Sequence, residues 1–464
     1  MKLSVIKDWT VSSQLGYMLK AYCYFPVTGI RRVLLGKDEN LKEYFRNCWG
    51  ILPRELLEQC AQRPVVWIEA QSMGEVGQLI SLCRELKRKF PDHAFVLSTH
   101  DKASLTLARK CLPLSGSFYS PWDIPWVCRR VVRLLRPNLL LYVEHVKSPI
   151  LLEESHRWGT QTILVSGFFP PGWENNSYLK RPVARRFWKF LDVAAVKEKE
   201  DFDTLTRFGM DPRFISIQGD LKFDANSMQV DEEKKQGLQR EFALHGESLF
   251  VAGSVHSHEA TFVVEAFLIA RRSIASLKLI LAPRWIEDVE RIEAVLFKYP
   301  VKVTRRSALS SESASDEDVL ILDTYGELAS LYAISTVVFM GGSLPDGSRA
   351  WTGLCHNMIE PLLHQKPIFF GTNTSYRRKM VEQLKEVWPR LEVTTPEELG
   401  GGIVNLLQNP GLLAALESRE RQMAVAQRGV VAGYVAFASE FLTKEENLEQ
   451  NSWLEKKEPA EVNP

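Results

Sequence analysis

The chain has 464 residues, more than the roughly 250 to 300 at which a single hydrophobic core usually divides, which excludes a single small module. Hydrophobic residues make up 45% of the chain and charged residues 25%, and this composition excludes general disorder. The formal net charge of +1 excludes a protein whose main task is to cover nucleic-acid phosphates, because such binding needs many basic contacts.

Residues 1–40 form the first predicted segment. The stretch YMLKAYCYFPVTGIRRVLLGK, residues 17–37, mixes aromatic and leucine side chains with four basic residues. This mixture suits a segment that lies on a membrane surface with its basic side chains reaching the headgroups, and a helix packed on its own domain fits it equally well. No run approaches 18 uninterrupted apolar residues, so the sequence predicts neither a membrane span nor a secretory signal.

Residues 41–226 are predicted to form an α/β domain. From Val65 onward, short apolar runs such as VVWIE, AFVLST, NLLLYVE and TILVS alternate with amphipathic stretches of helical length. Continuous apolar strands separated by helices indicate a parallel sheet covered on both faces. The basic aromatic stretch KRPVARRFWKF, residues 180–190, is interpreted either as a solvated basic helix or as a contact to anionic lipid.

Residues 227–442 repeat this architecture with a different sequence. The apolar runs SLFVAGS, LKLILAP, DVLILDT, TVVFMGG and KPIFFG are each followed by helix-compatible sequence. Residues 443–464 are interpreted as a charged, mostly disordered tail. The sequence therefore predicts an α/β protein of two facing Rossmann-like domains, each with a doubly wound parallel sheet.

Catalytic and ligand-binding residues are expected just after each apolar run, since open α/β sheets bind ligands beyond the carboxyl ends of their strands. The stretches found there are SMGEVG, VEHVKSP, GDLKFD, GSVHSHE, APRW, DTYGEL, GGS and HNMIEP. Glycines allow close approach of the backbone, and Arg and Lys supply charge for phosphate or carboxylate. This set favours a nucleotide-sugar site, while the lack of a P-loop or a G-x-G-x-x-G run disfavours ATP hydrolysis and dinucleotide redox chemistry.

Metal sites are weakly indicated. His256 and His258 would share one side of an extended backbone, but no carboxylate or cysteine cluster nearby completes a ligand set. The D-x-D pairs Asp201/Asp203 and Asp316/Asp318 are explained better by helix capping and by solvation. The seven scattered cysteines suggest neither a disulfide framework nor structural zinc and fit a reducing cytosol.

Several of these stretches, in order along the chain, resemble one known family. WIEAQSMGEV, SPWDIP, RPNLLLYVE, GDLKFD, GSVHSHE, PRW, DTYGEL with GGSL, and HNMIEP are similar to the blocks of the bacterial Kdo (3-deoxy-D-manno-octulosonic acid) transferases that act on lipid A. The resemblance runs from about Leu35 to Gly429. It implies the two-domain GT-B fold, CMP-Kdo as donor, no catalytic metal and no cofactor, and work at the cytoplasmic face of the inner membrane.

The resemblance also implies roles for individual residues. Glu75 matches the general base, and Glu144 and Lys222 match the groups that stabilise the transition state. The positions that match the CMP-sugar site, together with strand-end residues of the blocks GSVHSHE and GGSL, are Ser254, His256, Pro283, Arg284, Tyr325, Gly326, Glu327, Gly342, Asn357, Met358, Ile359 and Glu360.

The chain departs from the family pattern at four places. HVKSPI, residues 145–150, replaces the Thr-Glu-Leu-Trp-Pro-Asn run that follows the family's Glu, so that only Glu144 and Pro149 persist. GFFPPGWENNS replaces an Asn-Ala-Arg and Ser-rich turn. Both changes fall in the acceptor half. In the donor half, Trp285 stands where the family has a His, and PDGSRAWTGLC is an insertion.

The resemblance implies an inverting glycosyltransferase that moves Kdo, or a related acidic sugar, from CMP-Kdo to lipid A or its precursor in lipopolysaccharide biosynthesis. Its partners would be the donor, the lipid acceptor and the membrane surface, with no nucleic acid. Two alternatives stay open: a transferase or epimerase for UDP-sugars on the same fold, and a non-catalytic relative that binds lipid or a partner.

Overall fold

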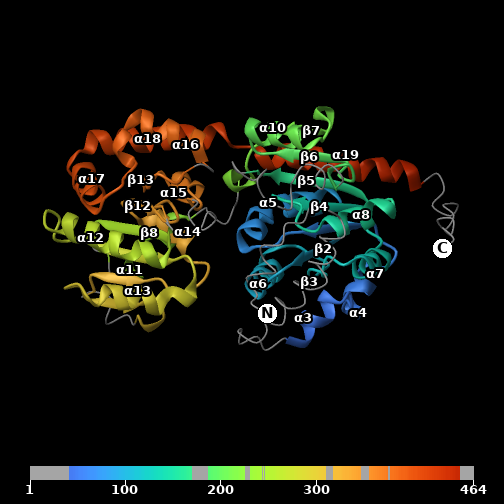
Figure 1. The fold of residues 1–464 in the computed structure, drawn as a ribbon, viewed down its shortest axis with the longest axis horizontal. Helices are drawn as coiled ribbons and strands as arrows, with labels where there is room; N and C mark the ends of the chain where they lie inside the picture. Colours follow the sequence, from blue (N-terminus) through green and yellow to red (C-terminus); the bar gives the residue numbers. More distant parts are fainter. Residues whose placement is uncertain are drawn as a thin grey trace, which may run out of the picture. The chain divides into compact units, whose positions relative to one another are not determined.

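The structure is a computed structural model that describes residues 41–169, 187–224, 230–242, 244, 246–309, 317–345, 355–374 and 377–449. The chain divides into two compact units (Figure 1). Unit 1 comprises Met1–Ala225 and Gly429–Pro464, and unit 2 comprises Asn226–Arg428.

Unit 1 is built on a seven-stranded parallel sheet in the order β3-β2-β1-β4-β5-β6-β7. Its strands are β1 (Val65–Glu69), β2 (Ala94–Thr99), β3 (Gly116–Tyr119), β4 (Leu139–Val143), β5 (Gln161–Gly167), β6 (Val193–Val196) and β7 (Ile215–Ile217). The strand order reverses direction between β1 and β4, and such a switch point is where open α/β sheets bind ligands.

Helices cover both faces of this sheet. They are α3 (Leu41–Cys48), α4 (Arg54–Cys60), α5 (Met73–Lys89), α6 (Lys102–Cys111), α7 (Pro125–Leu135), α8 (Pro149–Arg157), α10 (Lys199–Phe208) and α19 (Val430–Glu449), with short 3-10 turns η2 (Pro212–Phe214) and η3 (Leu221–Asp224). Alternate residues of β1 enter opposite cores: Trp67 packs in one hydrophobic cluster, and Val66 and Ile68 pack in the other. This two-sided burial explains why the strand is apolar throughout.

Unit 2 has a six-stranded parallel sheet in the order β10-β11-β9-β8-β12-β13, whose switch point lies between β8 and β12. Its strands are β8 (Leu249–Val255), β9 (Lys278–Pro283), β10 (Val303–Arg305), β11 (Val319–Ile321), β12 (Val337–Met340) and β13 (Ile368–Phe370). Its α-helices are α11 (Glu232–Glu241), α12 (Ala260–Arg271), α13 (Val289–Leu296), α14 (Leu328–Ile334), α15 (Ile359–Leu363), α16 (Arg378–Val387), α17 (Pro396–Gln408) and α18 (Pro410–Ala426). Its 3-10 turns are η5 (Ser257–Glu259), η6 (Ile286–Asp288), η7 (Arg306–Ala308) and η9 (Pro389–Leu391). The two parallel sheets confirm the predicted α/β class.

The C-terminal helix α19 belongs to unit 1, whereas the sequence prediction placed residues up to 442 in the second domain. Figure 1 shows this helix, in red, alongside the green strand β5, and it also packs on α5. Buried apolar side chains spaced like one helix face hold it there: Val430, Val431, Tyr434, Ala438 and Leu442. The helix continues to Glu449, so the first seven residues of the predicted disordered tail are helical.

Some of the predicted segments lie wholly or partly outside the described residues. The N-terminal segment 1–40, residues 180–186 of the basic aromatic stretch and Asp316 lie outside the described residues. At the end of that stretch, Phe187 and Trp188 are buried in the core of unit 1, so neither is on a solvated face. Within the ranges that the structure describes, we find no helix long and apolar enough to cross a bilayer.

Candidate functional site

Glu75 lies in the first turn of α5, directly beyond the carboxyl end of β1. The Ser72 hydroxyl caps this helix by accepting a hydrogen bond from the Glu75 backbone N–H at 3.3 Å. The Glu75 carboxylate is buried, with Oε2 accepting from the Gln71 N–H at 2.7 Å and Oε1 contacting the Lys147 ammonium at 2.7 Å. The helix start therefore places a buried carboxylate beyond the carboxyl end of β1, beside the switch point of the sheet.

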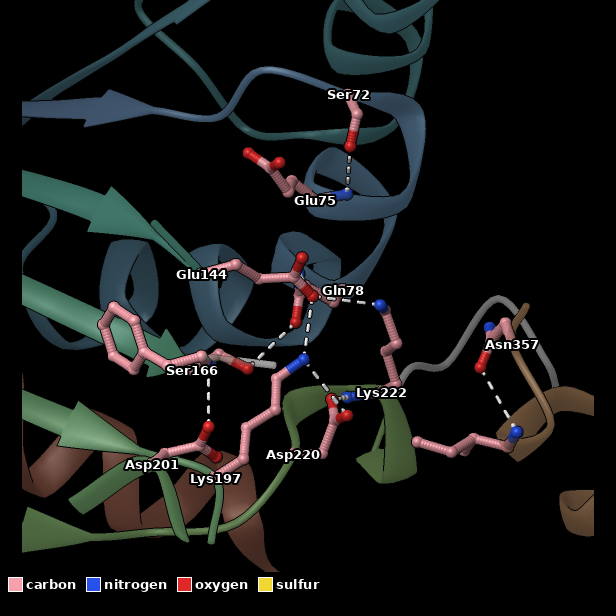
Figure 2. A network of polar contacts seen from close by, with 12 residues as sticks. Ser72, Glu75, Gln78, Glu144, Ser166, Lys197, Asp201, Asp220, Lys222 and Asn357 are labelled. Carbon is pink, nitrogen blue, oxygen red and sulfur yellow. Dashed lines mark hydrogen bonds and ion pairs between the residues drawn. The ribbon is translucent and has the colours of Figure 1, made fainter. Parts of the chain in front are cut away.

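Glu144 follows β4 directly and is the centre of a polar cluster (Figure 2). Its Oε1 accepts hydrogen bonds from Gln78 Nε2 at 3.1 Å, Lys197 Nζ at 2.8 Å and Lys222 Nζ at 3.0 Å. Burial alone would raise the pKa of Glu144, but the ammonium groups of Lys197 and Lys222 outweigh it and hold that pKa well below its usual range. Glu144 is therefore an anion at neutral pH.

The backbone of Glu144 is in the left-handed region, with φ of 58°. A non-glycine residue pays roughly 1 to 2 kcal/mol for this conformation and keeps it only where its surroundings fix it. Here the Glu144 N–H donates to Val165 O at 3.0 Å, and its carbonyl accepts from Phe168 N at 3.1 Å. Strand β5 thus holds the turn that directs this side chain into the cluster.

Lys197 is a site residue that the sequence analysis missed. It follows β6 directly, its side chain is 3% exposed, and its ammonium contacts both Glu144 at 2.8 Å and Asp220 at 3.2 Å. The same nitrogen lies 4.8 Å from the ring centre of Phe168. A signal was present, because Lys197 follows the apolar run VAAV, but a four-residue run is too short to stand out as a strand.

Gln78 was also missed, and it links the Glu144 carboxylate to the Ser166 hydroxyl. It lies one turn beyond Glu75 on α5, donates to Glu144, and accepts from the Ser166 hydroxyl at 3.0 Å. The structure therefore brings Glu75, Glu144 and Lys222 to the carboxyl edge of one sheet, together with Gln78 and Lys197.

A further buried carboxyl, Glu69, ends β1. Its oxygens accept from the Ser120 hydroxyl at 2.9 Å and from Gln71 Nε2 at 3.1 Å, and the Ser98 hydroxyl also donates to it. Burial raises the pKa of Glu69 to about 7, because these hydrogen bonds only partly offset the lost hydration.

Glu69 should make stability fall with rising pH. A group whose pKa is higher in the folded state stabilises fully below its unfolded pKa, near 4.5, and this contribution is lost as the pH rises through about 7. Relative to Glu69→Gln, the wild type should lose about 1 to 3 kcal/mol of unfolding free energy between about pH 5 and about pH 8.5. Urea unfolding of wild type and of Glu69→Gln at the two pH values measures this loss. Other titrating groups are present in both proteins, so their contributions cancel in the comparison. Parallel pH profiles would contradict the assignment.

In unit 2, the predicted donor residues lie at or beyond the carboxyl ends of β8, β9, β11 and β12, or near the start of α15. Ser254, in β8, has a left-handed φ of 56°, and a Cβ at Gly341 would stand 2.4 Å from its carbonyl oxygen. Residue 341, directly after β12, must therefore be a glycine, because any side chain there would clash with the backbone of Ser254. Gly342, with φ of 71°, donates its N–H to Glu259 Oε2 at 2.8 Å.

Glu259 organises this part of unit 2, and sequence reasoning missed it although it lies in the GSVHSHE block. The buried carboxylate accepts from three backbone N–H groups: His256 at 2.9 Å, Gly342 at 2.8 Å and Leu344 at 3.2 Å. It thereby ties the segment after β8 to the segment after β12.

His256 pairs with a second imidazole. Its Nε2 lies 2.9 Å from Nε2 of His356, next to the predicted Asn357, and burial lowers the pKa of His356 to about 3. One ring therefore donates to the other. Within the ranges that the structure describes, no group of three or more His, Cys, Asp or Glu could hold a metal ion.

The D-x-D pairs have structural roles where they are described. Asp201 accepts from the Glu198 N–H at 3.1 Å and from the Phe169 N–H at 2.7 Å, which confirms the predicted helix-capping role. Asp318 accepts from the Lys302 N–H at 2.9 Å and forms an ion pair with Arg271.

The remaining predicted donor residues follow β9 and β11 or begin α15. Pro283 ends β9, and Arg284 donates its backbone N–H to Val255 O at 2.8 Å. The guanidinium of Arg284 lies 4.8 Å from the Trp285 ring centre. The hydrogen bond from Arg284 to Val255 connects the ends of β8 and β9.

Tyr325, 60% exposed, and Gly326, with φ of 89°, precede Glu327, whose carboxylate is held by Arg306 Nη2 at 2.9 Å.

Asn357 Oδ1 accepts from the Ile359 N–H at 3.2 Å. Met358 and Ile359 are fully buried, and Glu360 is half-buried. Met358 and Ile359 therefore support the segment from the core, which leaves Asn357 and Glu360 as its polar side chains.

A family model and two relatives that match this chain carry the same description, 3-deoxy-D-manno-octulosonic acid transferase. Residues 45–225 match the family model of 3-deoxy-D-manno-octulosonic-acid transferase, or kdotransferase. A 3-deoxy-D-manno-octulosonic acid transferase of Chlamydia trachomatis is 26% identical over 395 residues, which is 84% of each chain. One of Aquifex aeolicus is 27% identical over 374 residues, or 80% of this chain and 91% of the relative.

Among solved structures, Anabaena HepE in complex with UDP and glucose is similar, with a TM-score of 0.57 and 13% identity, covering 82% of this chain and all of that chain. At this identity the likeness shows the fold alone, and it agrees with the GT-B arrangement of two parallel α/β sheets.

Proposed function

Because this chain is a divergent member of the Kdo transferase family, we propose that it transfers Kdo from CMP-Kdo to a hydroxyl of lipid A or its precursor in lipopolysaccharide biosynthesis. The observation that carries this proposal is the buried Glu75 carboxylate at the switch point of unit 1, one helical turn from the Gln78 amide that binds Glu144.

In the proposed step, Glu75 takes the proton of the acceptor hydroxyl while that oxygen forms a bond to the anomeric carbon of Kdo. The bond from this carbon to the phosphate oxygen breaks, and its electrons leave with CMP. The Glu144 carboxylate, held between Lys197 and Lys222, presents a fixed charge toward the sugar as positive character develops there. Because three hydrogen bonds hold this carboxylate, little reorganisation is needed during reaction.

Unit 2 is proposed to bind the CMP part of the donor. The guanidinium of Arg284 supplies charge for the phosphate, and the left-handed turns at Ser254 and Gly342 bring backbone to the switch point. The family relatives favour this donor over the UDP-sugar alternative.

The direct test is to incubate the protein with CMP-Kdo and a tetra-acylated lipid A precursor and to weigh the lipid product by mass spectrometry. The expected product is heavier than the precursor by one or more Kdo residues. An unchanged precursor, under conditions in which a known Kdo transferase converts it, would reject the proposal.

CMP should stabilise the protein more than UDP does. A nucleotide at about 100 times its dissociation constant adds about 2.7 kcal/mol to the stability of the unit that binds it. Arg284→Ala should weaken CMP binding by roughly 10- to 100-fold, as expected for a lost charge-assisted hydrogen bond. Thermal shift titrations with both nucleotides measure the effect. Arg272→Ala is the control, because Arg272 is exposed just after α12, at the end remote from the carboxyl edge of β8. A larger shift with UDP would favour the UDP-sugar alternative.

We further propose that the protein works as a peripheral protein on the cytoplasmic face of the inner membrane, supported by the basic aromatic composition of residues 17–37. Sedimentation with vesicles of anionic lipid tests this location. Protein that stays in the supernatant at low salt would contradict it.

A further inference from the structure

Lys147 is bound to the proposed base and comes from a segment where the chain departs from the family pattern. It lies three residues beyond Glu144, between β4 and α8, and its Nζ is 2.7 Å from Glu75 Oε1. The Glu75 side chain is 4% exposed, whereas that of Lys147 is 38% exposed. A partly exposed lysine side chain therefore reaches inward to a buried carboxylate.

Lysine ammonium groups balance the negative charges of the Glu75 and Glu144 carboxylates. Glu144 is paired with Lys197 and Lys222, and Lys197 also serves Asp220. The ion pair described for Glu75 is the one with Lys147, while its second oxygen accepts a backbone N–H.

Proton transfer would disturb this balance. When Glu75 takes the proton of the acceptor it becomes neutral, and the half-buried Lys147 ammonium loses its counter-charge. Removing one partner of a pair in such surroundings is unfavourable, since the remaining charge is only partly hydrated. An anion that arrives with the acceptor would replace the lost charge at the same place.

We propose that Lys147 recognises an acidic group, a phosphate or a carboxylate, that the acceptor carries beside the attacked hydroxyl. This inference rests on the proposed function of the same site. Lys147 pairs with Glu75 before the acceptor binds and turns to the acidic group when it arrives, which frees Glu75 Oε1 to take the proton. A lysine suits such an exchange, because its ammonium is a compact charge on a flexible stem. The site would thereby select acidic acceptors over neutral ones.

The test compares acceptors that differ in charge. The acceptors are the phosphorylated tetra-acylated lipid A precursor, the same precursor after removal of its phosphates, and the dephosphorylated precursor that already carries one Kdo and hence a carboxylate. Values of kcat and KM are measured with CMP-Kdo for wild type, Lys147→Met and Lys147→Arg. Lys110→Met is the control, because it removes the same charge from an exposed site at the end of α6.

Wild type should prefer the acidic acceptors, and Lys147→Met should lose roughly 10- to 100-fold in kcat/KM on them, mainly through KM. Its loss on the neutral acceptor should be smaller, so that the preference for acidic acceptors falls, and Lys147→Arg should retain most of the preference. The acceptor on which Lys147→Met loses most identifies phosphate or carboxylate as the recognised group.

Equal losses of Lys147→Met on acidic and neutral acceptors, or no loss on any acceptor, would overturn the inference. If Lys147→Met does not fold, Lys147→Gln replaces it in the same comparison. A wild type that transfers nothing to any of the three acceptors would instead reject the proposed function, so the two failures are distinguishable.

Discussion

Replacing Glu75 by glutamine should lower kcat by about 100- to 10,000-fold, the usual contribution of a general base. Glutamine keeps the size of the side chain and an oxygen that can accept the Gln71 N–H, but its amide cannot take a proton from the acceptor hydroxyl. Transfer from CMP-Kdo, followed by mass spectrometry of the lipid under single-turnover conditions, measures the loss. The affinity for CMP should stay within about twofold, because nucleotide binding is assigned to unit 2.

A matched control lies on the same helix. Glu85 is also on α5, is half exposed, and pairs only with Arg88 among the contacts described for it, so Glu85→Gln should transfer at the wild-type rate. If Glu75→Gln transfers as fast as Glu85→Gln, Glu75 is not the base. If the gene with Glu75→Ala also supports growth of a strain that depends on this protein, the non-catalytic alternative gains support.

Lys197→Met should destabilise unit 1 by about 3 to 5 kcal/mol, the range found when one partner of a buried ion pair is removed. The variant leaves Asp220 without the Lys197 ammonium and leaves Glu144 with Lys222. Both carboxylates are buried or nearly so, and water cannot readily take the place of the lost ammonium.

Hydrogen exchange at the amides of β4, β5 and β6 is the suitable measurement, since it reports unit 1 even if the two units unfold separately. Lys199→Met is the control, two residues along the chain. Lys199 is 62% exposed and forms an i,i+4 pair with Asp203, so its loss should cost at most about 0.5 kcal/mol. Equal protection in the two variants would show that the Lys197 pairs contribute little to stability.

Features that repeat along the sequence were predictable. The apolar runs identified the parallel sheets, since strands buried on both faces must be apolar at nearly every position. Because every carboxyl end in a parallel sheet lies on one edge, Glu144 after β4 and Lys222 after β7 could be placed on the same edge. Their contact at 3.0 Å could not, because two strands lie between β4 and β7.

Features that depend on tertiary contacts were not predictable. Lys197 follows a strand of four residues, Gln78 differs from other helical polar residues only by facing the site, and the role of Glu259 depends on backbone groups more than 80 residues away. The helix α19 was assigned to the wrong unit, because its periodic apolar face shows that it packs on something without showing on what.

The position of α19 makes unit 2 an insertion within the chain of unit 1. The chain leaves unit 1 after Ala225 and re-enters it at Gly429. The Asp224 carboxylate accepts the N–H of Gly429 at 3.2 Å and that of Val431 at 2.8 Å. The exit and the return are therefore fastened together on unit 1. Excision of unit 2 with a short glycine bridge would leave a continuous chain, whereas shortening the C-terminus to residue 428 would uncover one face of the first sheet.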